Sequence, residues 1–277
     1  MNNFVQSCLT KLEKNKIPNP ELDLRILLRH ASYKKKEMIL SNFKLNDINI
    51  KYFNYLFNRR LNNQPISKIT KKKSFWKSDF YVNSDVLDPR PESELIIEEV
   101  LNLIKNKHKT IEILDIGTGS GCLALSLALE FKNANILGID ISEKAIKVAK
   151  KNRRLLKISN RKVKFKLAEI ENINSKYDII VSNPPYLTFN EYNNSQIEIK
   201  NFEPKLALIG GNDGLKFYRL FAKKIEKILH NGSFFICEIG YKQLNSCKDI
   251  FKNTNLDLKK VSKDIQKNDR TLTFLKI

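Results

Sequence analysis

The sequence contains few of the residues that bind metals or form disulfides. Its 277 residues include only four cysteines and three histidines, at positions Cys8, Cys122, Cys237, Cys247, His30, His108 and His230. The cysteines lack the C-x-x-C spacing that is typical of zinc and redox sites. We therefore expect no metal site, and we expect a reducing compartment such as the cytoplasm.

Long apolar runs are also missing. No segment approaches the roughly 18 apolar residues that a membrane-spanning helix needs. The opening residues Met1-Asn2-Asn3-Phe4 lack the basic stretch followed by an apolar stretch that marks a secretory signal. We therefore expect no membrane association. A chain of this length is sufficient for one large domain and one small one.

Positive charge is in large excess, with a formal net charge of +20 and a pI near 9.7. A charge of this size is a property of many proteins that bind nucleic acids. However, Lys, Asn and Ile are frequent throughout, in predicted helices and loops alike, which indicates composition bias rather than a binding stripe. A ribosome-associated or acidic protein partner is the alternative interpretation.

The pattern of apolar residues predicts two kinds of structure. Residues 1 to about 70 have helical spacing and predict a small helical bundle. From Ile111 onward, short apolar runs alternate with amphipathic ones, which predicts an α/β fold with a mainly parallel, doubly wound, Rossmann-like sheet of seven strands. The strands are expected at 111–115, 135–140, 162–166, 177–182, 232–238, 256–261 and 271–276, and the helices at 121–131, 143–154, 214–229 and 242–251.

Prolines mark the predicted boundary between these parts. We assign residues 1–74 to a helical domain for substrate recognition, 75–92 to a hairpin or linker, and 93–277 to the second domain. A helix is expected at 93–105 and a short strand or hairpin at 79–86. The lysine-rich run from Lys68 to Lys77 is interpreted as a solvated linker edge.

A glycine-rich turn follows the first strand of the sheet. Three glycines alternate with small polar residues directly before a helix, at Gly117-Thr118-Gly119-Ser120-Gly121. Glycines at such a turn let the backbone approach a ligand, and the helix N-terminus offers free N–H groups. The spacing differs from the G-x-G-x-x-G of dinucleotide-binding proteins. Asp140, at the end of the next strand, is placed to hold two ribose hydroxyls.

The motif Asn183-Pro184-Pro185-Tyr186 closes another predicted buried strand. Each proline fixes its own φ and keeps the preceding residue out of the helical region, so the turn is stiff and extended. The Asn183 side-chain oxygen and the Pro184 carbonyl oxygen can then accept both hydrogens of one planar –NH2 group. Tyr186 offers a flat face for the rest of that group. The motif favours chemistry on an amino group attached to an sp2 carbon.

The glycine turn, Asp140 and the Asn-Pro-Pro-Tyr motif, in this order, resemble the S-adenosylmethionine-dependent class I methyltransferases. The chain as a whole resembles the PrmC/HemK family, the N5-glutamine methyltransferases of class I peptide chain release factors. The segments that carry this resemblance are DLRILLRH (23–30), QPI (64–66), VLDPRPESE (86–94), SNPPY (182–186), EPKLALIGGNDGL (203–215), EIGYKQ (238–243) and Asp269-Arg270.

The resemblance implies a methyl transfer from S-adenosylmethionine to the glutamine of a Gly-Gly-Gln loop. It implies that Gly117 to Gly121 cradle the methionine moiety and that Asp140 binds the ribose. It places Glu169 and Ile170 along the adenine. Asn183, Pro184, Pro185 and Tyr186 would then hold the glutamine amide, with Asn183 also beside the cofactor.

The sequence departs from the family pattern at several positions and leaves other substrates open. Asp88 stands where an apolar residue is usual, and Ser93 replaces a usual threonine. The alternatives are a glutamine methyltransferase of a ribosomal protein, and an enzyme that methylates exocyclic amino groups of RNA or DNA. A further hypothesis, a methyltransferase-fold binding factor without activity, does not account for the intact glycines, Asp140 and the Asn-Pro-Pro-Tyr motif.

Overall fold

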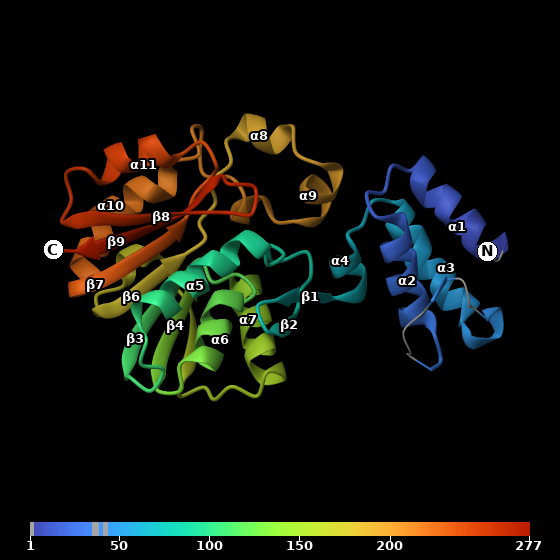
Figure 1. Cartoon of the computed structure of the whole chain (residues 1–277), viewed down its shortest axis with the longest axis horizontal. Coiled ribbons are helices and arrows are strands. Elements are labelled where there is room, and N and C mark those ends of the chain that lie inside the picture. Colours follow the sequence, from blue (N-terminus) through green and yellow to red (C-terminus); the bar gives the residue numbers. More distant parts are fainter. Residues whose placement is uncertain (1–2, 35–38, 41–43) are drawn as a thin grey trace. The chain divides into compact units, whose positions relative to one another are not determined.

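The computed structural model describes residues 3–34, 39–40 and 44–277, and it divides into a helical unit and a larger unit built on a sheet (Figure 1). The helical unit comprises Met1–Lys72 together with Gln196–Phe202, and the larger unit comprises Lys73–Ser195 and Glu203–Ile277. Residues 196–202 therefore pack with the N-terminal helices, although they follow them by more than a hundred positions in the chain. Every helix in the described ranges is too short or too polar to span a bilayer.

The helical unit confirms the helices predicted for the first 70 residues. Pro20 stands at the first position of its helix, where a missing N–H costs nothing, and acidic residues follow in the first turn. Asn49 caps another helix because its Oδ1 accepts a hydrogen bond of 3.0 Å from the Tyr52 N–H. The helices are α1 (Asn3–Lys14), α2 (Pro20–Ala31), α3 (Ile50–Leu61), α4 (Ile66–Thr70) and α9 (Ile197–Phe202), with a 3-10 turn at Leu45–Asp47.

A buried arginine lies at the centre of the polar contacts in the helical unit. The Arg60 Nε donates to Asp23 Oδ2 at 2.6 Å, and its Nη1 donates to Glu198 Oε1 at 2.7 Å. The Arg60 side chain is only 4% exposed. A buried guanidinium needs such partners, because an unpaired buried charge costs several kcal/mol. Arg60 thus ties α9 to α2 and α3 within this unit.

The larger unit contains a hairpin, a seven-stranded sheet and the helices that cover it. Its strands are β1 (Lys72–Phe75), β2 (Ser78–Tyr81), β3 (Ile111–Ile116), β4 (Ala134–Asp140), β5 (Val163–Leu167), β6 (Tyr177–Ser182), β7 (Leu229–Glu238), β8 (Leu256–Lys263) and β9 (Asp269–Lys276). Its helices are α5 (Glu94–Leu103), α6 (Cys122–Glu130), α7 (Glu143–Leu155), α8 (Phe189–Asn193), α10 (Lys216–Ile228) and α11 (Leu244–Phe251), with 3-10 turns at Pro91–Ser93, Ile170–Asn172 and Lys205–Ala207.

The sheet has the order β5-β4-β3-β6-β7-β9-β8, with parallel pairing from β5 to β7 and β9 antiparallel to both of its neighbours. The predicted seven-stranded, mainly parallel sheet is thereby confirmed. The chain reverses its direction of winding at β3, which lies between β4 and β6. The carboxyl ends of β3, β4 and β6 therefore meet where ligands bind in folds of this kind.

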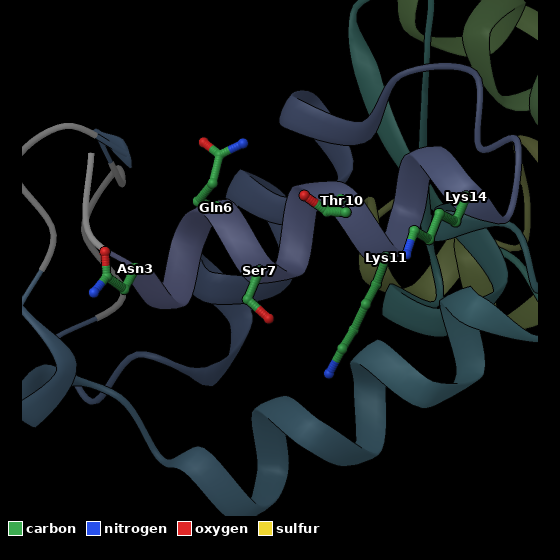
Figure 2. A pocket seen from close by; sticks show the side chains of 6 residues that line it. All are labelled: Asn3, Gln6, Ser7, Thr10, Lys11 and Lys14. Atoms are coloured by element: carbon green, nitrogen blue, oxygen red, sulfur yellow. The ribbon is translucent and has the colours of Figure 1, made fainter.

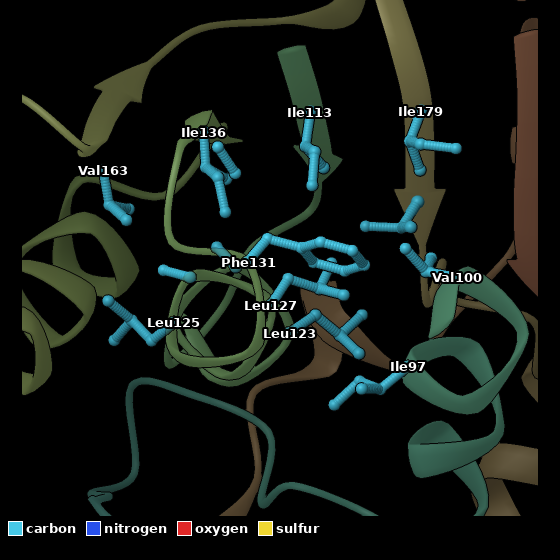
Figure 3. Close-up of a cluster of buried hydrophobic side chains, with 14 of the residues drawn as sticks. Ile97, Val100, Ile113, Leu123, Leu125, Leu127, Phe131, Ile136, Val163 and Ile179 are labelled. Carbon is cyan, nitrogen blue, oxygen red and sulfur yellow. The ribbon is translucent and has the colours of Figure 1, made fainter. Parts of the chain in front are cut away.

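Helices cover both faces of the sheet. Along β3, Ile113 packs into the apolar cluster under α5, α6 and α7, and the next residue, Leu114, packs into the cluster under α10 and α11. Figure 3 shows the first cluster, with Phe131 and the leucines of α6 against Ile113 and Ile179 of the sheet. Burial on both faces explains why the parallel strands appear in the sequence as continuous apolar runs.

The segment from Lys68 to Lys77 differs from its predicted role as a solvated linker edge. Lys68 ends up 3% exposed and Phe75 1% exposed. Phe75 lies in β1 and packs edge-to-face on Phe80 of β2, with ring centroids 6.1 Å apart. The aromatic residue therefore belongs to the core of the sheet unit, and the prediction was wrong for these two positions.

Candidate functional site

A cavity of about 350 Å³ opens at the carboxyl ends of the parallel strands. Four strands that follow one another in the chain contribute to its wall at or just after their carboxyl ends. The predicted site residues that line it are Gly117 and Gly119 after β3, Asp140 at the end of β4, Glu169 and Ile170 after β5, and Asn183, Pro184 and Pro185 after β6. Apolar side chains such as Val86, Ile139 and Phe217 line much of the remainder, together with a few polar ones such as Asp85 and Lys216. The topology thus brings together eight residues that were predicted from separate segments.

The three glycines of the turn after β3 serve different purposes. All three have positive φ, at 71° for Gly117, 54° for Gly119 and 81° for Gly121, which only glycine adopts without strain. A Cβ on Gly117 would meet no atom within 4 Å, so this part of the turn faces open space. A Cβ on Gly121 would lie 2.9 Å from Phe165 Cζ. Gly121 therefore allows α6 to pack closely on the sheet and does not line the cavity.

Thr118 and Ser120 are buried behind this turn. The Thr118 hydroxyl donates to Asp115 Oδ2 at 2.6 Å, and the Ser120 carbonyl accepts from Asn152 Nδ2 at 2.8 Å. Asp115 Oδ1 has no hydrogen-bond partner in the described part of the chain. Burial raises the pKa of Asp115 to about 7. Asp115 was not among the predicted site residues, although it lies only two residues before Gly117.

Asp140 anchors the open part of the turn. Its Oδ2 accepts from the Gly119 N–H and its Oδ1 from the Ser142 N–H, both at 2.9 Å. Burial raises the pKa of this carboxyl group, and the backbone donors oppose that rise. A carboxylate has about four lone-pair sites, so Asp140 keeps acceptor capacity on the cavity side.

The Asn-Pro-Pro-Tyr motif follows β6, whose last residue is fixed to β3 by a hydrogen bond from Ser182 Oγ to the Ile116 carbonyl at 2.9 Å. The Asn183 side-chain nitrogen donates to Ser93 Oγ at 2.7 Å, and Ser93 Oγ in turn donates to Glu238 Oε2 at 2.5 Å. When Glu238 is ionised, the only proton of the serine hydroxyl goes to its carboxylate, so Ser93 acts as an acceptor towards Asn183. This fixes the orientation of the Asn183 amide, with its oxygen turned away from Ser93.

Two oxygens of the motif are left with unused acceptor capacity. No described residue donates a hydrogen bond to Asn183 Oδ1 or to the Pro184 carbonyl. Both residues line the cavity. The turn therefore presents two neighbouring residues with free acceptor oxygens at the cavity wall, as the sequence predicted for the binding of an –NH2 group.

Tyr186 does not line the cavity. Its hydroxyl donates to Glu238 Oε1 at 3.2 Å, and its ring packs against the apolar cluster under α10 and α11. Burial raises the pKa of the Tyr186 hydroxyl above its ordinary value, with the Glu238 charge adding to the rise. Close packing around Gly210 and Gly214 supports the turn from the other side, since a Cβ on Gly210 would lie 2.5 Å from the Pro185 carbonyl oxygen.

Ser93 and Glu238 are functional candidates that sequence reasoning missed. Both lie in segments that carry the family resemblance, but 90 and 52 residues separate them from Asn183 and Tyr186, their respective partners. Only the folded sheet brings them together. Burial raises the pKa of Glu238 to about 7, and its hydrogen bonds with Ser93 and Tyr186 oppose that rise.

A second hollow, of about 420 Å³, lies on the helical unit. Figure 2 shows the side chains that line it, which are Asn3, Gln6, Ser7, Thr10, Lys11 and Lys14. All six come from α1, and none of them belongs to the predicted site. This polar face gives no basis for a catalytic role.

Comparison with known proteins agrees with this geometry. The PrmC N-terminal domain model matches residues 4–70, and a methyltransferase domain model matches residues 107–275. A solved methyltransferase structure from Pyrococcus furiosus superposes with a TM-score of 0.55 at 21% identity, over 79% of this chain and 96% of that one. The strand order and the domain match together define a class I methyltransferase.

Curated relatives identify the family. A release factor glutamine methyltransferase of Buchnera aphidicola is 37% identical over 253 residues, which cover 90% of this chain and 89% of that protein. A bifunctional methyltransferase of Rickettsia typhi is also 37% identical, over 95% of this chain but only 54% of that protein. The chain thus spans about half the length of the bifunctional relatives it matches. It belongs to the release factor glutamine methyltransferase family.

Proposed function

We propose that this protein transfers a methyl group from S-adenosylmethionine to the N5 atom of the glutamine in the Gly-Gly-Gln motif of class I peptide chain release factors. Membership of the family supports the reaction and the substrate class. The observation that carries the proposal is the pair of free acceptor oxygens on Asn183 and Pro184 at the cavity wall.

The residues around the cavity fit the proposed cofactor. Space is open above Gly117, as a bound methionine moiety requires, and the spare acceptor capacity of Asp140 suits a ribose diol. Ile170 is 4% exposed and offers an apolar surface for a planar base, with Glu169 beside it. Thr118, Ser120 and Gly121 do not line the cavity and would contribute by stabilising the conformation of the turn. S-adenosylmethionine, when bound, supplies a methyl group activated by its sulfonium.

The proposed chemistry assigns orientation and hydrogen-bond acceptance to the protein. The lone pair of an amide nitrogen is delocalised into its carbonyl, so the group is a poor nucleophile. The oxygens of Asn183 and Pro184 accept its two hydrogens and favour a more pyramidal nitrogen. The bound cofactor would supply its methyl group to this nitrogen and leave as a neutral thioether, and the nitrogen would lose one proton to water. These reaction steps need no general base from the protein.

Tyr186 and the helical unit have supporting roles in the proposal. The motif predicts that Tyr186 packs on the substrate amide, but its ring lies outside the cavity wall, so we propose that Tyr186 instead holds the turn in place through its hydroxyl bond to Glu238. Residues 1–74 would recognise the protein substrate, which the match to the PrmC N-terminal domain supports. A cytoplasmic location and proximity to the ribosome belong to the same proposal, and the four free cysteines suit a reducing compartment.

The test compares turnover with cofactor binding in Asn183→Ala. Loss of one acceptor at the reacting group should lower kcat by about 10²–10³-fold, in line with the removal of a single preorganised group in other enzymes. Binding of S-adenosylmethionine, measured by calorimetry, should change much less. Asn255→Ala, an exposed asparagine before β8, is the matched control. Equal losses in turnover and cofactor affinity would refute the proposed role of Asn183.

A further inference from the structure

Positive charge is concentrated in one short segment of the sheet unit. Residues 143–166 contain 11 Lys and Arg residues and one acidic residue, Glu143. The rest of that unit contains 23 Lys and Arg residues and 23 Asp and Glu residues. The entire net charge of the unit therefore lies in these 24 residues. The helical unit, with 16 Lys and Arg residues and 6 Asp and Glu residues, carries the other half of the net charge of the chain. Uniform composition bias does not by itself account for residues 143–166, because the rest of the sheet unit has equal numbers of positive and negative side chains.

The segment forms an exposed surface along one side of the sheet. It comprises α7, the connection that follows it, and most of β5, which is an edge strand. Figure 1 shows α7 lying on the sheet beside α6. Apolar side chains such as Ile146 and Ala149 point into the core, whereas Lys150, Arg154 and Lys157 are exposed. On β5, Val163 and Phe165 are buried and the intervening Lys164 is exposed. We call residues 143–166 the α7–β5 basic surface.

Few of these charges are neutralised by the protein itself. In the described residues, carboxylates form ion pairs only with Lys144 and Lys147 of this surface, and the Lys144 pair is long at 3.6 Å. Lys150 and Lys151 lie three and four residues after Lys147, and Arg154 lies four and three residues after them, which are helical spacings at which like charges repel. The fold offsets this repulsion in part, since Lys151 lies 3.3 Å from the centre of the Tyr81 ring and Arg153 and Lys162 donate to backbone carbonyls, but few carboxylates of the protein neutralise the charge.

Ordinary structural reasons account for only a part of this charge. The C-terminal end of a helix favours cations, but its dipole is equivalent to only about half a unit charge. An exposed edge strand is protected from pairing by one or a few lysines. Nine cations without a described carboxylate partner exceed both needs, so an external anionic partner explains them better.

We propose that the α7–β5 basic surface binds the phosphate backbone of RNA. Lysines are depleted in the core of protein–protein interfaces, which use aromatic and apolar anchors instead. This surface has no exposed aromatic side chain, because its only aromatic residue, Phe165, is 6% exposed. Without aromatic rings to stack on bases, the surface suits phosphates and does not read sequence. Binding to RNA phosphates would keep the protein close to the ribosome. This proposal does not depend on the proposed methyl transfer.

The experiment measures binding to a labelled RNA duplex of random sequence by fluorescence anisotropy over a range of salt concentrations. The test variant carries Lys150→Gln, Arg154→Gln, Lys157→Gln and Arg161→Gln. The control variant carries Lys223→Gln, Lys227→Gln, Lys248→Gln and Lys252→Gln, which remove the same charge from exposed positions in and after α10 and α11. Thermal melting and methyl transfer to a release factor verify that both variants are folded.

The test variant should bind RNA at least tenfold more weakly than the control variant at about 0.1 M salt. The slope of log K against log salt should fall by about 0.9 for each phosphate that the test variant no longer neutralises, and the control variant should keep the wild-type slope. Equal losses in both variants would overturn the proposal, because net charge alone would then be responsible. Failure of the wild-type protein to bind RNA at low salt, or equal competition by polyglutamate of matched charge, would also overturn it.

Discussion

The hydrogen bond between Asn183 and Ser93 leads to a prediction that separates positioning from binding. Ser93 is 2% exposed and lies outside the cavity wall, so its proposed influence on the reaction passes through Asn183. Ser93→Ala removes the acceptor for Asn183 Nδ2 and leaves the amide free to rotate. It also removes the donor to Glu238 Oε2.

The size of the effect follows from these contacts. A neutral hydrogen bond contributes about 0.5–1.5 kcal/mol, which corresponds to a factor of up to about ten in rate. A reacting group misplaced by about 1 Å can cost about 10²-fold. We therefore expect kcat for methyl transfer to fall between about 10-fold and 100-fold in Ser93→Ala. The affinity for S-adenosylmethionine should remain close to that of the wild type.

The assay is single-turnover methyl transfer with labelled cofactor, on Ser93→Ala, Ser93→Thr, Asn183→Ala and the double variant Ser93→Ala/Asn183→Ala. Threonine keeps the hydroxyl and should restore most of the rate. The double variant should be no slower than Asn183→Ala, since Ser93 acts through Asn183. A wild-type rate in Ser93→Ala, or losses that add in full in the double variant, would refute the reasoning.

Three further predictions concern stability and cofactor binding. Burial raises the pKa of Glu238 to about 7 from an ordinary 4.5, so between these pH values the folded state keeps a proton that the unfolded chain loses. The free energy of unfolding should therefore fall as pH rises from about 4.5 to 7. Urea titrations at several pH values should show a weaker dependence of this free energy on pH in Glu238→Gln. Gly121→Ala should lower the melting temperature more than Gly117→Ala because its Cβ would clash with Phe165, whereas Gly117→Ala should weaken S-adenosylmethionine binding in calorimetry. Arg60→Ala should destabilise the helical unit by about 3 kcal/mol in chemical denaturation, since it leaves the buried Asp23 carboxylate and the half-buried Glu198 carboxylate without their shared partner. A loss below about 1 kcal/mol would contradict this account.

The strands of the sheet could be predicted because their signal is local. Parallel strands buried on both faces appear as short apolar runs, and each predicted strand was found within a few residues of its expected position. Chain order then placed Gly117, Asp140 and Asn183 at strand ends that the doubly wound topology brings together. The cavity-lining part of the candidate site was therefore accessible from the sequence.

The parts that could not be predicted depend on contacts between distant segments. Nothing local connects Ser93 with Glu238, which lie 145 residues apart and share a buried hydrogen bond. Nor does any local pattern assign residues 196–202 to the helical unit, since the ion pair from Arg60 to Glu198 spans 138 positions. Gly121 looked like its neighbours in the turn, and only its distance to Phe165 reveals a packing role.

The most direct test of the central claim is methyl transfer from labelled S-adenosylmethionine to purified substrates offered in parallel. These are an intact class I release factor, the same factor with its Gly-Gly-Gln glutamine changed to alanine, ribosomal protein and total RNA. We predict label on the intact factor alone. Label on RNA or ribosomal protein instead would contradict the proposed substrate, and the absence of label from every substrate would contradict the proposed activity.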